Sequence, residues 1–249
     1  MTKHYALEVK QLSVSYDGVS AIHDMTFCIE PGKLIGIVGP NGAGKSTMIK
    51  AILELIPYHS GSVRFFNKPV KQMRKQIAYV PQRNDIDWNF PILVEDTVLL
   101  GTYPKLGLIK RPSKKDKTFA SQCLQTVGMY DYRHKQISEL SGGQQQRVFM
   151  ARALAQEADI LFLDEPFVGI DIASEKMIVD ILKKLRSEGK TIFIVHHDLS
   201  KVTTYFDDVL LLNKTLIAHG PAKDVMTPQV MSEVYNMDFQ LFTESGDET

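Results

Sequence analysis

The sequence has 249 residues, of which 29 are Lys or Arg and 29 are Asp or Glu, so its formal net charge is zero. The composition is ordinary for a soluble globular protein, and the chain is long enough for one large domain or two small ones. The balanced charge gives no indication of a nucleic-acid-binding protein, which is usually basic. Cys28 and Cys123 lack a CxxC spacing and suit a reducing compartment. Because the N-terminus does not resemble a signal peptide and the apolar runs are shorter than the roughly 18 residues of a membrane span, we expect a cytosolic chain held at a membrane only through a partner.

The first elements in chain order are predicted to be strands. Residues 6–16 and 20–30 alternate in polarity and indicate a half-exposed antiparallel sheet. Residues 33–39 are a continuous apolar run that ends in glycine, which is typical of a buried parallel strand. A helix should follow, because apolar residues then recur at helical spacing, and Pro57 is expected to end it.

The rest of the chain predicts an α/β protein with a helical insertion. From about Val94 to Ala155 the pattern is mostly helical, and two buried strands follow, at 159–166 and 190–198, with a helix between them. A hairpin should close the core, and the tail from about Thr227 should fray. The expected parts are an ATP-binding core with its antiparallel β subdomain (1–85 and 156–226), a helical subdomain (86–155) and a C-terminal tail (227–249).

A glycine-rich loop carries the first functional motif. Residues 39–46 match G-x-x-x-x-G-K-[ST] between a predicted strand and a predicted helix, which is the context of a P-loop. The glycines let the backbone curl so that N–H groups point at phosphate oxygens, Lys45 supplies a positive charge, and Ser46 offers a hydroxyl to Mg²⁺. An ordinary glycine turn would not need every fixed position. The predicted phosphate-binding residues are Gly39, Asn41, Gly42, Ala43, Gly44, Lys45, Ser46 and Thr47.

Two carboxylates follow the apolar strand residues 160–163. We expect Asp164 to hold Mg²⁺ and Glu165 to polarise the attacking water as a general base. The alternative is a strand end that is acidic by chance, which the presence of a P-loop in the same chain disfavours.

A second anion site is predicted at residues 140–144, Leu-Ser-Gly-Gly-Gln. Ser141 is the expected N-cap of a helix whose first amides are bared by Gly142 and Gly143. Together with the P-loop, "LFLDEP" and "IVHHD", this motif resembles the nucleotide-binding subunit of ATP-binding cassette (ABC) transporters, over Leu7 to about Val225. The resemblance implies a P-loop NTPase (RecA-like) core with an N-terminal antiparallel β subdomain and an inserted α-helical subdomain.

The resemblance also implies how two phosphate sites serve one chain. In this family two copies pair head to tail, and the Ser-Gly-Gly helix of one caps the γ-phosphate held by the P-loop of the other. Ser141, Gly142, Gly143 and Gln144 are therefore expected to contact ATP across a homodimer. Further implied partners are a transmembrane permease and, indirectly, an extracytoplasmic metal-binding protein, but no nucleic acid. The chain would lie at the cytoplasmic face of the membrane, held there through the permease.

Other family positions carry over residue by residue. Tyr16 matches the aromatic residue that stacks on adenine, and Gln82 matches the glutamine that reaches Mg²⁺ and the lytic water. His197, directly before an aspartate, matches the γ-phosphate-sensing histidine, whereas His196 is expected to be structural or exposed. Asp171 matches the aspartate that signals across the dimer interface, although Gly-Ile precedes it where many members have Ala-Leu. The implied Mg²⁺ ligands are Ser46, Gln82 and Asp164, and the implied catalytic residues are Glu165, His197 and Gln82.

The cargo is suggested by the segment after Gln82. Its Asp-Trp-Asn-Phe-Pro run resembles the branch that imports manganese, zinc or iron, and we expect manganese first and zinc second. Trp88 and Phe90 could anchor the permease or pack inside the helical lobe. The basic stretch 105–117 is expected to be a solvated loop, with anionic lipid as the alternative ligand.

Other classes of protein fit less well. A soluble ABC ATPase acting on nucleic acid or ribosomes predicts a second cassette or a long coiled-coil insert, and neither is present in the sequence. A P-loop kinase would lack the Ser-Gly-Gly helix and need an acceptor site. An exporter would usually be fused to its membrane domain.

Overall fold

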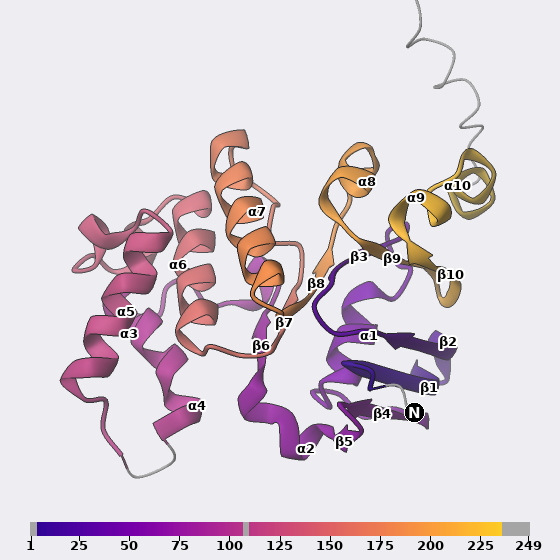
Figure 1. Cartoon of the computed structure of the whole chain (residues 1–249), viewed down its shortest axis with the longest axis horizontal. Coiled ribbons are helices and arrows are strands. Elements are labelled where there is room, and N and C mark those ends of the chain that lie inside the picture. Colours follow the sequence, from indigo (N-terminus) through magenta and orange to yellow (C-terminus); the bar gives the residue numbers. More distant parts are fainter. Residues whose placement is uncertain (1–3, 107–109, 236–249) are drawn as a thin grey trace, which may run out of the picture. The chain divides into compact units, whose positions relative to one another are not determined.

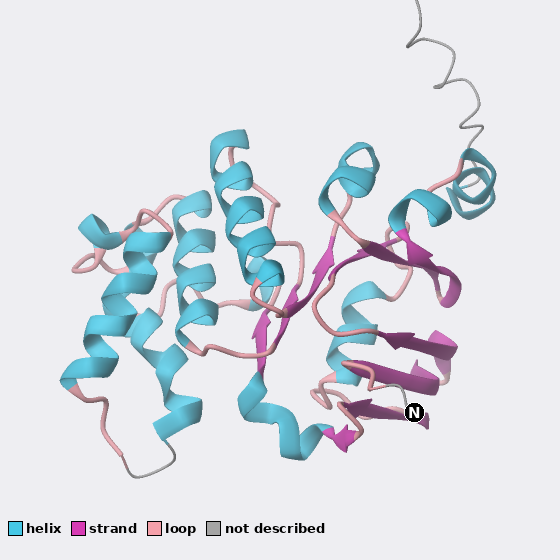
Figure 2. Cartoon of the chain, in the orientation of Figure 1, coloured by secondary structure: helices cyan, strands magenta, loops and turns pink. Residues whose placement is uncertain are grey.

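The computed structural model describes residues 4–106 and 110–235. The chain divides into two compact units, 1–70 with 195–249 and 71–194. The boundaries fall inside α2 (Val70–Met73) and at the last residue of β8 (Thr191–Val195). Both units combine helices with strands (Figure 2), which confirms the predicted α/β class. No helix within the described residues is both long enough and apolar enough to cross a membrane.

The first unit contains the predicted antiparallel sheet, with strand order β2-β1-β4-β5 (Figure 1). Buried positions alternate with exposed ones at the start of β1, where Leu7 and Val9 point into the core, so the period-two prediction is confirmed. The strands are β1 (Leu7–Tyr16), β2 (Val19–Ile29), β4 (Ser60–Phe65) and β5 (Lys68–Pro69).

A mixed sheet in the same unit leads to the glycine-rich loop. β3 (Leu34–Val38) is buried along its whole length and runs parallel to β9 (Asp208–Asn213), which forms an antiparallel hairpin with β10 (Thr215–Pro221). The predicted buried strand and closing hairpin are therefore confirmed. The chain leaves β3 directly into the loop that precedes α1 (Lys45–Ile52).

Helix α1 ends earlier than its apolar pattern suggested. Pro57 was expected to end the helix, but α1 stops at Ile52 because Glu54 takes a left-handed conformation with φ +54°. The amides of Glu54 and Leu55 donate to the carbonyls of Ala51 (3.0 Å) and Lys50 (2.8 Å), which is a Schellman motif. Local backbone hydrogen bonds thus end the helix before the proline acts.

Short helices complete the first unit: η6 (Leu199–Lys201), α8 (Val202–Tyr205), α9 (Ala222–Val225) and α10 (Pro228–Tyr235). The tail was expected to fray from about Thr227, but α10 is helical because Met231 and Val234 are buried against the unit. The remainder of the tail, after Tyr235, lies outside the described residues.

The second unit holds parallel strands in the order β8-β7-β6. β7 (Ile160–Leu163) is buried throughout, and its Phe162 stacks on Phe193 of β8 with ring centroids 4.5 Å apart and planes 6° apart. β6 (Ile77–Val80) pairs with β7 in register, Val80 opposite Leu163. Because parallel strands end at the same edge, the residues that follow β6 and β7 meet there.

Helices α3, α5 and α6 of this unit pack together, as Figure 1 shows, and the mostly helical region expected over 94–155 is confirmed. α7 lies between β7 and β8 in the chain, as predicted. The α-helices are α3 (Val94–Leu99), α4 (Tyr103–Leu106), α5 (Lys114–Thr126), α6 (Gly142–Ala155) and α7 (Ile172–Ser187). The 3₁₀ turns are η1 (Arg74–Gln76), η2 (Arg83–Asp85), η3 (Leu100–Thr102), η4 (Tyr130–Tyr132) and η5 (Ile137–Glu139).

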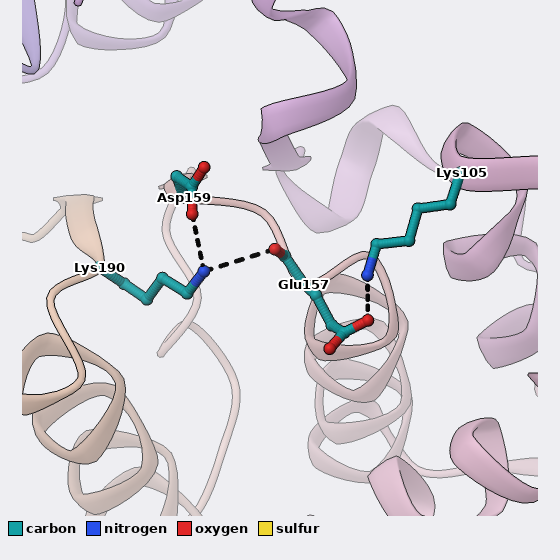
Figure 3. A network of polar contacts seen from close by, with 4 residues as sticks. All are labelled: Lys105, Glu157, Asp159 and Lys190. Atoms are coloured by element: carbon teal, nitrogen blue, oxygen red, sulfur yellow. Dashed lines mark hydrogen bonds and ion pairs between the residues drawn. The ribbon is translucent and has the colours of Figure 1, made fainter.

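A polar network spans the amino-terminal ends of β7 and β8 (Figure 3). Lys190 Nζ donates to Asp159 Oδ1 (2.9 Å) and to the carbonyl oxygen of Glu157 (3.4 Å), and Glu157 also pairs with Lys105. These side chains lie at the opposite strand ends from Asp164, so they hold the helical part to the strands without approaching the predicted catalytic carboxylates.

The basic stretch 105–117 is partly helical rather than a loop. Ser113 and Asp116 form a capping box that starts α5 at Lys114, so residues 114–117 are its first turn. At the other end of the stretch, Lys105 is paired with Glu157. Residues 107–109 lie outside the described residues.

Candidate nucleotide-binding site

The predicted P-loop connects β3 to α1 in the first unit. Gly44 has φ +90°, and a Cβ there would lie 2.3 Å from Cγ2 of Ile22 and 2.9 Å from the carbonyl oxygen of Ala21, so only glycine fits. Gly42 also has positive φ, +79°, but within the described residues no heavy atom lies within 4 Å of a Cβ built on it. The loop therefore packs tightly at Gly44 and presents bare backbone at Gly42.

The ammonium group of Lys45 is buried inside this loop. Its Nζ donates to the carbonyl oxygens of Gly39 (2.8 Å) and Pro40 (2.9 Å), and the residue is only 6% exposed. These carbonyls satisfy the buried ammonium, but a charged phosphate oxygen would be the stronger acceptor. Gly44, at the N-cap of α1, has no side chain to satisfy the first amides of the helix, and no acidic residue lies in the first turn. Ser46 and Thr47 stand in that turn, so the helix start is suited to an anion.

Tyr235 of α10 supports the loop, and the sequence analysis missed it. The backbone of Gly39 hydrogen-bonds to the Tyr235 phenol, while burial raises the pKa of Tyr235 to about 12, the larger of the two influences. No sequence pattern connects a tyrosine in the tail with the P-loop, because the contact exists only once α10 docks on the unit.

Tyr16 and the two histidines complete the predicted residues of the first unit. Tyr16 ends β1 and is 49% exposed, as a ring that stacks on a base must be. His196 is 4% exposed and lies against the rings of Tyr205 and Phe206, with centroids 5.9 and 5.5 Å away, whereas His197 is exposed. His196 therefore packs inside the unit, and His197 is the accessible histidine of the pair.

In the second unit the structure brings Gln82 and Asp164 together at the carboxyl edge of β6 and β7. Gln82 Nε2 lies 3.4 Å from Asp164 Oδ1, and Asp164 is 1% exposed. Glu165 follows in the left-handed region with φ +54°. A non-glycine residue held there costs about 1–3 kcal/mol, and such strain often marks functional sites. Glu165 is half-buried, whereas Asp164 beside it is fully buried.

Tyr79 is a second residue that the sequence analysis missed. It lies in β6, and its hydroxyl is buried with no hydrogen-bond partner in the described parts of the chain. Burial raises the pKa of Tyr79 well above its usual range, and the charges of Asp164 and Asp85 raise it further. The phenol therefore stays protonated beside the Asp164 carboxylate.

The Ser-Gly-Gly motif starts α6 as expected. Ser141 is the N-cap in a capping box: its Oγ accepts from the amide of Gln144 (3.4 Å), and Gln144 Oε1 accepts from the amide of Ser141 (2.9 Å). Gly142 and Gly143 supply the first amides of the helix. Because a helix offers its first N–H groups no carbonyl acceptor of its own, this end of the helix suits an anion. The guanidinium of Arg83, a residue that the sequence analysis did not single out, packs against Gly142.

Asp171 is the N-cap of α7 in the same unit. Its Oδ1 accepts from the amide of Ser174 (2.9 Å) and its Oδ2 from the Ser174 hydroxyl (2.7 Å). These hydrogen bonds hold the pKa of Asp171 below its usual value. A Cβ on Gly143 would lie 3.8 Å from Asp171 Oδ2, so the predicted signalling aspartate adjoins the Ser-Gly-Gly turn.

Known proteins resemble this chain over most of its length. The ABC transporter family profile matches residues 22–168. The ATP-binding protein of the manganese transport system of Halalkalibacterium halodurans is 55% identical over 241 residues, 97% of this chain and 96% of that protein. The zinc transport system ATP-binding protein of Treponema pallidum is 49% identical over 231 residues, 93% and 87% of the two chains.

A solved structure shares the fold. A metal-chelate type ABC transporter in an inward-facing conformation superposes with a TM-score of 0.82 at 26% identity, covering 94% of this chain and 90% of that one. The fold expected from the sequence, a P-loop NTPase core with a helical insertion, is thereby confirmed. This chain is an ATP-binding, ATP-hydrolysing member of the ABC transporter family.

Proposed function

We propose that this chain powers a membrane importer of manganese by hydrolysing ATP as a head-to-tail dimer. The observation that carries the proposal is the nearly end-to-end similarity to the manganese transport ATP-binding protein of Halalkalibacterium halodurans. The Bacillus subtilis protein of the same description is 49% identical over 231 residues. The P-loop built around Lys45 supports the nucleotide-binding part of the proposal.

The catalytic roles follow from the chemistry of the side chains. Ser46, Gln82 and Asp164 offer oxygen atoms, which Mg²⁺ prefers, and the contact between the last two supports a shared role. When bound, Mg²⁺ neutralises charge on the phosphate oxygens. Glu165 accepts a proton from the attacking water, and His197 hydrogen-bonds to the γ-phosphate. Tyr16 stacks on the adenine ring.

The assembly follows from the second anion site. The turn formed by Ser141, Gly142 and Gly143 has amides but no cationic residue of its own, so we propose that it caps a γ-phosphate already held by the P-loop of another copy. Asp171 adjoins this turn, and we propose that it transmits the state of one nucleotide site to the other across the dimer interface. A permease holds the dimer at the cytoplasmic face of the membrane and receives metal from an extracytoplasmic binding protein.

The domain division is proposed on the same basis. Residues 1–85 and 156–226 form the ATP-binding core with its antiparallel β subdomain, and residues 86–155 form the helical subdomain that meets the permease. Phe90, 58% exposed, remains available as a permease anchor. Trp88 instead packs on Phe149.

Zinc is the second candidate cargo, favoured by the 49% identity to the zinc transport protein of Treponema pallidum. The test is reconstitution of this chain with its permease in proteoliposomes. ATPase rates are measured against binding protein loaded with manganese, zinc or a ferric chelate, with Glu165→Gln as the background control. Stimulation by the manganese-loaded form alone supports the proposal, stimulation by another form replaces the cargo, and no stimulation by any form contradicts metal import.

A further inference from the structure

The segment from Gln82 to Phe90 is fastened to α6 by one aromatic contact and one hydrogen bond. The Trp88 ring meets the Phe149 ring edge-on, with centroids 5.1 Å apart and planes 62° apart. Trp88 Nε1 donates to the carbonyl oxygen of Arg83 (2.7 Å), and this hydrogen bond ties Trp88 to the backbone of η2. Trp88 is half-buried, and its ring packs on α6 instead of standing free as a surface anchor.

The Arg83 side chain then reaches the start of α6. Its Nη2 donates to Gln145 Oε1 (3.2 Å), and Gln145 is itself 4% exposed and held by a hydrogen bond from its Nε2 to the carbonyl of Ile137 (3.1 Å). A Cβ built on Gly142 would lie 2.7 Å from Arg83 Nη1 and 3.0 Å from its Cζ. Only glycine at position 142 therefore lets the guanidinium lie in this place.

This contact is not one that helix electrostatics would favour. The amino-terminal end of α6 carries the positive end of the helix dipole, and its first turn, Gly142 to Gln144, contains no acidic residue. A cation there must be held by specific contacts, and the acceptor on Gln145 and the Trp88 ring, 5.9 Å from Arg83 Cζ, supply them. These contacts hold the guanidinium at a place that the helix dipole alone would disfavour.

The same side chain also adjoins the loop before α7. Arg83 Nη1 lies 3.9 Å from a Cβ position on Gly169, two residues before Asp171. Arg83, the residue directly after Gln82, thus lies against both Gly142 and Gly169. Gln82 in turn contacts Asp164.

We propose that Arg83 is a positioning residue that couples the Gln82 loop to the Ser141–Gly143 turn. A displacement of Gln82 moves Arg83 through the adjoining backbone, and Arg83 sets the orientation of the turn through Gln145 and Gly142. The turn is therefore correctly oriented for a second copy only when Gln82 is in its place beside Asp164. This proposal rests on the proposed function, since the turn is taken to bind nucleotide across a dimer.

The test is a double-mutant cycle in the full chain carrying Glu165→Gln, so that ATP-driven dimers accumulate. Arg83→Met retains the aliphatic stem and removes the guanidinium, and Gln145→Met removes the acceptor. ATP affinity is measured with a fluorescent ATP analogue on dilute monomer, and dimerisation by light scattering over an ATP titration. Arg133→Met is the matched control, because its guanidinium lies over Tyr130 at 4.3 Å in the same unit.

We expect Arg83→Met to leave the monomer's nucleotide affinity unchanged and to raise the ATP concentration for half-maximal dimerisation roughly tenfold, the worth of one charge-assisted hydrogen bond. Gln145→Met should add little to Arg83→Met, whereas Arg133→Met should dimerise normally. Unchanged dimerisation by Arg83→Met, or strict additivity of the two substitutions, would overturn the role of Arg83. Absence of ATP-driven dimers in the Glu165→Gln parent would overturn the proposed function itself, and this proposal with it.

Discussion

Substitution of Gly44 by alanine tests the local packing that shapes the P-loop. The new Cβ would lie 2.3 Å from Cγ2 of Ile22 and 2.9 Å from the carbonyl oxygen of Ala21, in a residue with φ +90°. The left-handed backbone costs an L-residue about 1–2 kcal/mol, and overpacking a tight site costs about 1–3 kcal/mol. Gly44→Ala should therefore lower the free energy of unfolding by about 2–5 kcal/mol.

Gly42→Ala is the matched control in the same loop. Its φ is similar, +79°, but within the described residues no heavy atom lies within 4 Å of the added Cβ. The expected cost is the backbone contribution alone, about 1–2 kcal/mol. Both variants are unfolded in urea and followed by far-ultraviolet circular dichroism, where the midpoint of Gly44→Ala should lie roughly 0.5–1.5 M below that of Gly42→Ala. Equal midpoints would refute the claim that Ile22 and Ala21 enforce glycine at position 44.

Three further predictions concern the catalytic residues and one helix cap. Glu165→Gln should bind ATP normally but hydrolyse it about 10²–10⁴-fold more slowly, measured by phosphate release, and a normal rate would remove Glu165 from the base role. Lys45→Ala should weaken ATP binding at least about tenfold in a fluorescent-nucleotide titration, because a charge-assisted hydrogen bond is lost; unchanged affinity would contradict this. Asp171→Asn keeps the cap of α7 but removes the charge. Because the folded-state pKa of Asp171 is lowered by its hydrogen bonds from Ser174, the carboxylate stabilises the fold above its usual pKa and loses this effect as the pH falls through the folded-state value. The stability difference between wild type and Asp171→Asn should therefore shrink between about pH 6 and about pH 3, and a constant difference would contradict this account.

The Trp88 contact shows how far residue type alone can be interpreted. A tryptophan beside an exposed phenylalanine is consistent both with a partner surface and with internal packing, and the sequence left both open. In the structure Trp88 packs on Phe149 of α6 and Phe90 stays exposed. The two aromatics differ because the Trp88 ring meets Phe149, a residue about sixty positions later in the chain, and composition does not encode such a contact.

The local motifs were predictable from the sequence because each depends on residues close together in the chain. The P-loop needs glycines, a lysine and a serine in one short run, the strand before Asp164 needs four consecutive apolar residues, and the cap at Ser141 needs Gln144 three residues later. Hydrogen bonding within one turn and burial of one strand act over such distances, so residue order alone determines them.

The long-range contacts were decided only by the tertiary structure. Tyr235 reaches Gly39, Arg83 reaches Gly142 and Gln145, and the Tyr79 hydroxyl lies buried near Asp164. Each of these pairs joins residues from different elements, and it depends on how helices and strands dock rather than on any local pattern. Docking follows from the summed burial of many apolar side chains, and a polar side chain placed by that docking carries no signal of its own in the sequence.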